Sequence, residues 1–152
     1  MEMGMRARSL AQTMFEWDNP NMSQIADVIS SMLMFLTSPQ IMVAGGGDRS
    51  CGPLRDGYVA AHSLPMVLCP HFFSTTDEQR IRTLVHESAH LAGIGSPNNE
   101  SYCIVFDCVK GCGGFDSADS WAHYVHCLSG EKADKPDSLG ARAPPGSQGQ
   151  PP

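Results

Sequence analysis

Apolar side chains recur every three or four positions between residues 21 and 37, the spacing that places them on one face of an α-helix. The members of this stripe are Ile25, Val28, Ile29, Met32, Leu33 and Leu36. Asn19-Pro20 supplies a helix start signal before the stripe, and Ser38-Pro39 supplies a stop signal after it. The segment therefore predicts an amphipathic helix whose stripe belongs to the hydrophobic core.

A second helical pattern follows the sequence Thr75-Thr76-Asp77-Glu78, in which Thr75 and Glu78 match a capping box and acids occupy the first turn. Its apolar face consists of Ile81, Leu84, Val85, Ala89 and Ala92. Gly93 and Gly95 are expected to end this helix, because glycine tolerates the left-handed backbone conformation found there. A last helix is expected to begin at Ser117.

Two short apolar runs, residues 57–61 and 66–68, are typical of strands, with a turn expected at residues 62–65. The expected fold class is α+β, mostly helical, with a small antiparallel sheet or hairpin beside the helix that follows Thr75. Residues 1–130 are expected to form the folded domain. Residues 131–152 are rich in proline and glycine and poor in apolar side chains, so we expect a disordered tail.

The composition narrows the range of partners. The chain has 152 residues, of which 41% are hydrophobic, and its formal net charge is −6. Acids and bases balance in residues 131–152, so the whole negative excess belongs to the body, which argues against nucleic acid as a partner. No run of 18 apolar residues is present, so no membrane span is expected. The N-terminal residues lack the apolar stretch of a signal peptide.

Cysteine usage suggests disulfides and an oxidising compartment. The six cysteines are Cys51, Cys69, Cys103, Cys108, Cys112 and Cys127. Two alternatives remain open from the sequence: reduced, partly buried thiols, or a cysteine zinc site around Cys108-x3-Cys112, which lacks a clear second half. The disulfide interpretation implies a chain that is secreted or delivered to an extracytoplasmic compartment.

The residues that carry chemistry are His86-Glu87-Ser88-Ala89-His90, on the second predicted helix. Histidines four positions apart project from one helical face and can bind one Zn2+ together, which predicts one zinc ion per chain. Glu87 is then placed to accept a proton from the water that the metal activates. The alternative is a surface helix carrying two solvated histidines.

A catalytic zinc usually takes three protein ligands and keeps one position open. The candidates for the third ligand are Glu100, Asp107, Asp116, Asp119, His123 and His126. Glu100 is favoured because it is the nearest carboxylate after the glycine turn, although it could instead cap a following helix. Asp119 could offer a negative group to a basic substrate side chain, or could simply favour the first turn of the last helix.

Several segments resemble the deuterolysin-like aspzincins, the metalloendopeptidases that include deuterolysins and peptidyl-Lys metalloendopeptidases. The similar segments, in order along residues 50–128, are Met66 through Phe73, Thr83 through His90, Gly95 through Tyr102, and Ala118-Asp119-Ser120-Trp121. The resemblance implies a zincin-like fold with His86 and His90 as zinc ligands and Glu87 as general base. It also implies that Tyr102 stabilises the oxyanion and that Asp119 lines a substrate-binding pocket.

The chain departs from the family pattern where the final glycine after the tyrosine is replaced by Cys103, and at two positions that matter more. The family's third ligand is an aspartate three residues before the tyrosine, a position held here by Asn99, with Glu100 one residue later. The lysine-specific members carry a second pocket acid three residues after the first, where this chain has Ala122. Strict preference for lysine is therefore not implied.

The function expected from the sequence is a zinc-dependent metalloendopeptidase that hydrolyses peptide bonds in a polypeptide or peptide substrate. One alternative is a toxin domain that cleaves the peptides of peptidoglycan. Another is a non-catalytic module in which the zinc only holds structure. The fourth coordination position distinguishes the last alternative, because protein fills it in a structural site and water fills it in a catalytic site.

Overall fold

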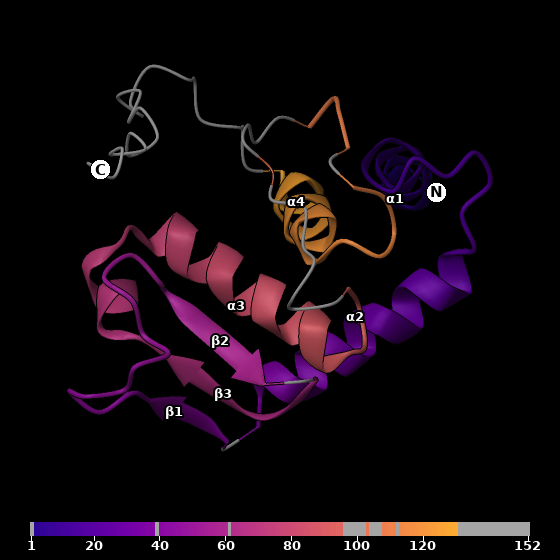
Figure 1. Ribbon diagram of the computed structural model, residues 1–152. Helices are drawn as coiled ribbons and strands as arrows, with labels where there is room; N and C mark the ends of the chain where they lie inside the picture. The colour runs from indigo at the N-terminus through magenta and orange to yellow at the C-terminus, as the bar shows by residue number, and fades with distance from the viewer. Residues whose placement is uncertain are drawn as a thin grey trace, which may run out of the picture.

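The computed structural model describes residues 2–38, 40–60, 62–95, 103, 108–111 and 113–130 (Figure 1). Within these residues the α-helices are α1 (Glu2–Met14), α2 (Met22–Leu36), α3 (Asp77–Leu91) and α4 (Ala118–Ser129), and η1 (Pro70–Ser74) is a short 3₁₀ helix. The strands are β1 (Ile41–Val43), β2 (Gly57–Ala60) and β3 (Ser63–Leu68). The class is therefore α+β, as the sequence predicts, and the expected tail at residues 131–152 lies outside the described residues.

The sheet has three strands in the order β1-β3-β2. β2 and β3 form the expected antiparallel hairpin, with Tyr58 opposite Val67, but β3 already begins at Ser63, within the turn expected at residues 62–65. β1 runs parallel to β3, with Ile41 opposite Met66, so the sheet is mixed and contains a third strand beyond the expected hairpin. A three-residue strand is too short to display an alternating pattern, and its place in the sheet is decided by tertiary contact with β3.

The helix boundaries follow local capping chemistry. The Asn21 side chain, two residues after the expected start signal at Asn19, accepts hydrogen bonds from backbone N–H groups at the start of α2. α4 begins at Ala118, one residue after its expected start, and Ser117 is its N-cap. α3 differs from the prediction by one residue, because Thr76 is the N-cap and accepts from the Gln79 N–H. The Thr75 hydroxyl instead donates to the Phe72 carbonyl at 2.7 Å, which closes η1.

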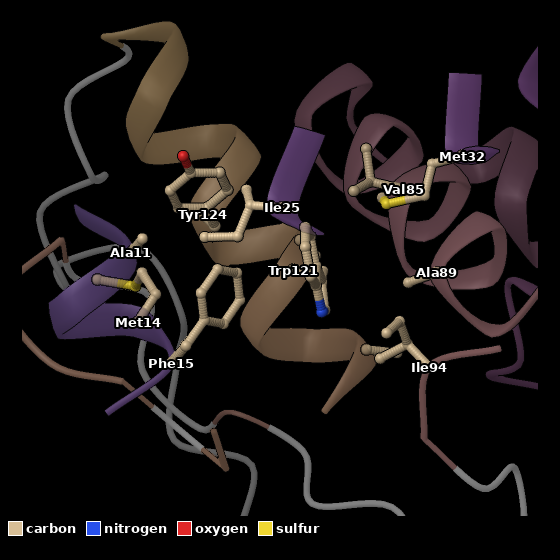
Figure 2. Close-up of a cluster of buried hydrophobic side chains, with 12 residues drawn as sticks. Ala11, Met14, Phe15, Ile25, Met32, Val85, Ala89, Ile94, Trp121 and Tyr124 are labelled. Carbon is tan, nitrogen blue, oxygen red and sulfur yellow. The ribbon is translucent and has the colours of Figure 1, made fainter. Parts of the chain in front are cut away.

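A hydrophobic core joins the four α-helices (Figure 2). Trp121 of α4 is fully buried at its centre, and its ring centroid lies 4.6 Å from that of Phe15, just after α1. Helix α1 has no counterpart in the sequence predictions, yet it supplies Ala11 and Met14 to this core. A second, smaller cluster lies between the sheet, η1 and the end of α3.

Helix α3 lies between the sheet and α4, and α2 also contacts it (Figure 1). Because neighbours cover it on several sides, every residue from Val85 to Leu91 is buried. This buried stretch includes two histidines, a glutamate and a serine. Charged and polar side chains rarely occupy such positions without a specific partner or role, so the second half of α3 is where a site is expected.

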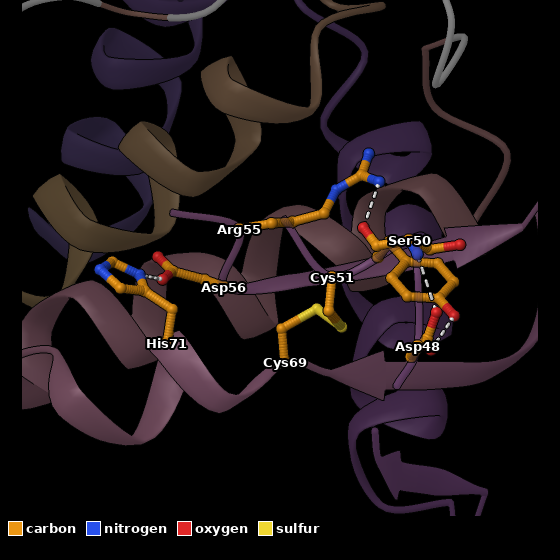
Figure 3. Close-up of a disulfide and its surroundings, with 8 residues drawn as sticks. Asp48, Ser50, Cys51, Arg55, Asp56, Cys69 and His71 are labelled. Carbon is orange, nitrogen blue, oxygen red and sulfur yellow. Dashed lines mark hydrogen bonds and ion pairs between the residues drawn. A yellow bond between two sulfur atoms is a disulfide. The ribbon is translucent and has the colours of Figure 1, made fainter. Parts of the chain in front are cut away.

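Two disulfides link cysteines among the described residues, Cys51 to Cys69 and Cys108 to Cys127, which confirms that the chain forms disulfides. The first ties the loop before β2 to the end of β3 (Figure 3). The second ties the segment before α4 to the last turn of that helix. No helix within the described ranges is long and apolar enough to cross a membrane.

Candidate active site

His86 and His90 lie one turn apart on the buried half of α3. Their ring centroids are 4.9 Å apart and the ring planes are nearly perpendicular, at 86°. Glu87 lies beside them and is 8% exposed. The helix therefore brings the two predicted ligands and the predicted base into one small region, as the spacing required.

The orientation of His86 is set by Asp119 on α4. The Nδ1 atom of His86 lies 2.7 Å from Oδ1 of Asp119. Because an ionised carboxylate only accepts hydrogen bonds, Nδ1 is the donor, which leaves Nε2 as the ring nitrogen that can bind a metal. A metal-binding histidine is held in this way by an acceptor behind its other ring nitrogen.

The second oxygen of Asp119 accepts two further hydrogen bonds. Arg82 donates to Oδ2 at 3.1 Å, and the backbone N–H of Cys103 donates to the same oxygen at 2.7 Å. Burial by itself raises the pKa of Asp119, but the hydrogen bond with His86 and the charges of His86 and Arg82 outweigh it, so the pKa lies below its ordinary value. Asp119 is therefore an ionised carboxylate with a partner at each oxygen.

The resemblance implies that Asp119 is a pocket acid, and the residue does line the cavity beside the two histidines. Its side chain is 2% exposed, and its oxygens are directed at His86, Arg82 and Cys103. The geometry suits a residue that positions a histidine better than one that binds a substrate cation. The sequence could not distinguish these roles, because it does not show which side chains of α3 and α4 meet.

His90 is held by backbone instead of by a side chain. Its Nδ1 lies 2.9 Å from the carbonyl oxygen of Ile94, so this ring also carries its proton on Nδ1 and its lone pair on Nε2. The carbonyl of His90 in turn lies 2.6 Å from Nδ1 of His62, in the turn between β2 and β3. His90 is 2% exposed, so its surroundings hold the ring tightly.

A cavity of about 350 Å³ opens beside these residues, between β2 with its preceding loop and helix α3. The lining residues from the loop and strand are Leu54, Arg55, Asp56, Gly57, Tyr58 and Val59. Those from the two helices are Gln79, Arg82, Thr83, His86, Glu87, His90 and Asp119. The predicted ligands and base thus line a space large enough to take part of a peptide.

The loop that forms the outer wall of the cavity is firmly held (Figure 3). Asp56 accepts hydrogen bonds from His71, from Gln79 at 2.8 Å and from Thr83 at 3.3 Å, which attach the loop to η1 and α3. At its other end the Tyr58 hydroxyl donates to Asp48 at 2.8 Å. This bond is the main reason that the pKa of Asp48 lies below its ordinary value.

Glu100 and Tyr102 lie outside the described residues, as does Asp107, so the predicted third ligand and oxyanion residue are not placed. Within the described ranges, no group of three or more His, Cys, Asp and Glu side chains could hold a metal ion. The remaining candidates, Asp116, Asp119, His123 and His126, therefore do not complete a site with the two histidines of α3.

Both ends of the segment that contains Glu100 lie at the site. A Cβ atom added to Gly95 would lie 2.9 Å from the Asp116 carbonyl oxygen and 3.5 Å from Cε1 of His90, so the chain passes His90 closely here. The backbone of Cys103 contacts Asp119, which contacts His86. The seven residues 96–102 thus join Gly95, beside His90, to Cys103, whose backbone contacts the Asp119 that holds His86.

Comparison of the chain with protein-family models, curated proteins and solved structures finds no match. The resemblance to the aspzincins therefore stays an expectation from the sequence motifs. The geometry around His86, Glu87 and His90 carries the functional argument independently of that likeness.

Sequence reasoning missed two residues of the site. Arg82 is four positions before His86, so helical spacing alone places it on the same face of α3, and this signal was available. His62 reaches the His90 carbonyl from the hairpin turn, where its φ is 57°. No sequence pattern indicates that contact, because it depends on how the hairpin packs against α3.

Proposed function

We propose that the chain is a zinc-dependent peptidase whose metal is held by His86 and His90 and whose general base is Glu87. The observation that carries the proposal is the pair of anchored imidazoles. Each Nδ1 faces an acceptor, Asp119 for His86 and the Ile94 carbonyl for His90, so both rings keep their metal-binding lone pair on Nε2. Two solvated surface histidines would have no such arrangement.

The donor set fits zinc in its chemistry. Neutral imidazole is a favoured zinc ligand, and a carboxylate is a common third one. Glu100 is proposed for that place, because the segment containing it begins beside His90 and ends beside Asp119. The two histidines also line an open cavity, which supports a catalytic site over a structural one, since structural zinc sites are closed by protein ligands.

When bound, zinc would polarise the peptide carbonyl and lower the pKa of a water molecule at the site. Glu87 would take a proton from that water on its carboxylate and pass it to the leaving amide nitrogen, as a general base and then a general acid. Asp119 would hold His86 in place by accepting the hydrogen bond from its Nδ1. Tyr102 is proposed to donate its hydroxyl to the developing oxyanion.

Strand β2 would hold the substrate in an extended conformation. It is an edge strand of the sheet, and three of its residues, Gly57, Tyr58 and Val59, line the same cavity as Glu87. An extended peptide can add to such an edge through main-chain hydrogen bonds. A Cβ atom at Gly57 would lie 3.0 Å from the Val67 carbonyl oxygen, so a larger residue there would disturb the hairpin.

The two disulfides support function in an oxidising, extracytoplasmic compartment. A secreted or delivered peptidase is consistent with this chemistry. The net charge of −6 and the absence of a basic run give no support to a nucleic-acid substrate.

Removal of the metal is expected to abolish cleavage. We expect the purified chain to cut an unfolded, fluorescein-labelled protein substrate, to lose this activity with a zinc chelator, and to regain it on adding one equivalent of Zn2+. Release of labelled fragments measures the effect. Cleavage that continues unchanged in zinc-depleted protein would exclude the proposed mechanism, and no cleavage of peptides or unfolded proteins by zinc-loaded protein would exclude the proposed activity.

Asp119→Asn is expected to weaken zinc binding by about 10- to 100-fold, the usual cost of losing an acceptor behind a metal-binding histidine. Competition with a chromophoric chelator measures the affinity. Asp27→Asn, the same change on the exposed surface of α2, is the matched control and should leave the affinity unchanged. Equal zinc affinity in wild type and Asp119→Asn would show that Asp119 does not position a ligand.

A further inference from the structure

The ion pair between Arg82 and Asp119 presents only one of its charges to the cavity. The Asp119 side chain is 2% exposed, whereas that of Arg82 is 34% exposed, and the cavity is lined by both. The carboxylate is engaged by His86, Arg82 and the Cys103 N–H on its protein side. A substrate that enters the cavity therefore meets the guanidinium group more than the carboxylate.

The loop before β2 also lines the cavity with one partly buried acid, Asp56, and one exposed base, Arg55. Asp56 has a 13% exposed side chain and accepts hydrogen bonds from His71, Gln79 and Thr83, so its charge is directed into the protein. Its neighbour Arg55 is exposed, and its guanidinium carbon lies 5.5 Å from the ring centroid of Tyr58 (Figure 3). Arg55 also donates to the Ser50 carbonyl at 3.0 Å, which keeps it at the cavity wall.

Arg82 lies at the part of the cavity that precedes His86 along α3. Arg82 is one turn before His86, a displacement of roughly 6 Å at the rise of an α-helix. A peptide that passes Glu87 in an extended conformation advances about 3.3 Å per residue, so a side chain close to the bond at Glu87 reaches Arg82. A side chain of opposite charge gains a charge-assisted hydrogen bond there.

We propose that the cavity selects peptides with an acidic side chain, Asp or Glu, close to the bond that is cleaved, and that Arg82, supported by Arg55, recognises this carboxylate. This assignment rests on the proposed peptidase function and names its substrate class. It is the reverse of the basic preference considered from the sequence, in which Asp119 faces the substrate. The reversal follows from the exposures of the two side chains, 34% for Arg82 and 2% for Asp119.

Peptide binding to zinc-loaded Glu87→Gln protein tests the proposal without requiring cleavage. Three fluorescein-labelled peptides of six alanines, each with one internal alanine replaced by Glu, Gln or Lys, are compared by fluorescence anisotropy. The peptides can shift along the cavity, so the test does not depend on knowing which side of the cleaved bond meets Arg82. The Glu peptide is expected to bind about tenfold more tightly than the Gln peptide, and the Lys peptide most weakly.

Variants in the same Glu87→Gln background assign the preference to its residue. Arg82→Gln should remove the difference between the Glu and Gln peptides, Arg55→Gln should reduce it, and Arg82→Lys should keep it in part because the charge remains. Arg8→Gln, on the exposed part of α1, is the matched control and should change nothing. Circular dichroism confirms that each variant is folded before binding is compared.

Equal binding of the three peptides, a preference for lysine, no measurable binding of any peptide, or a Glu preference that survives Arg82→Gln would each overturn the proposal. The cleavage assay on wild-type protein is read separately. An acidic preference in binding with no cleavage would contradict the peptidase function and leave the role of Arg82 intact. Cleavage without an acidic preference would support the peptidase function and contradict the role of Arg82.

Discussion

Glu87→Gln is expected to reduce peptide cleavage by about 10³-fold, within the range that a positioned general base contributes. Glutamine has nearly the same shape as glutamate but cannot take a proton from water. Glu87 is buried beside the two histidines and lines the cavity, so the variant should lose chemistry without losing its surroundings. Turnover of a fluorogenic peptide under saturating conditions measures the loss directly.

The zinc content and the fold of Glu87→Gln are compared with those of wild type to separate lost chemistry from lost structure. Glu87→Gln should keep one zinc per chain and an unchanged circular dichroism spectrum, because Glu87 is not a proposed ligand. Glu78→Gln, in the first turn of the same helix and 44% exposed at its side chain, is the matched control and should retain full activity. A Glu87→Gln variant that keeps most of its activity would remove Glu87 from the mechanism.

Trp121→Ala is expected to lower the free energy of unfolding by about 3–5 kcal/mol, the usual cost of truncating a buried large aromatic residue. Trp121 is fully buried beside Phe15 and Tyr124 (Figure 2). Phe115 also contacts it, and the three ring centroids lie 4.6–6.2 Å from that of Trp121. Its indole N–H also donates to the Phe115 carbonyl at 2.8 Å, a hydrogen bond that alanine cannot make.

Urea unfolding followed by circular dichroism measures this change with the disulfides intact. The loss is a large part of the 5–15 kcal/mol that a domain of this size usually has, so the variant should unfold at much lower urea. Trp121→Phe fills part of the space and should cost less. A loss below about 1 kcal/mol for Trp121→Ala would show that the helical core does not depend on this contact.

The helices with strong local signals could be predicted from the sequence. The stripe from Ile25 to Leu36 corresponds to α2, and α4 begins one residue after its expected start at Ser117. These elements carry both an apolar period and a cap, so local chemistry is sufficient to define them. β1 has neither signal, because three residues are too few to show an apolar period. Its strand conformation depends on pairing with β3.

In the candidate site, too, features set by local spacing could be predicted, whereas features set by helix packing could not. The spacing of His86 and His90 predicted that they share a helical face, and the structure brings them together. The role of Asp119 could not be predicted, because it depends on the packing of α4 against α3. Arg82 lies at the interface of these two helices, and only the structure shows that it covers the buried carboxylate.

The most direct test of the account is the zinc content of the purified wild-type chain, measured by elemental analysis after exhaustive dialysis in zinc-containing and then zinc-free buffer. The account predicts one zinc per chain in wild type and none retained in His86→Ala or His90→Ala. Folded wild-type protein that retains no zinc, or histidine variants that retain as much zinc as wild type, would contradict it.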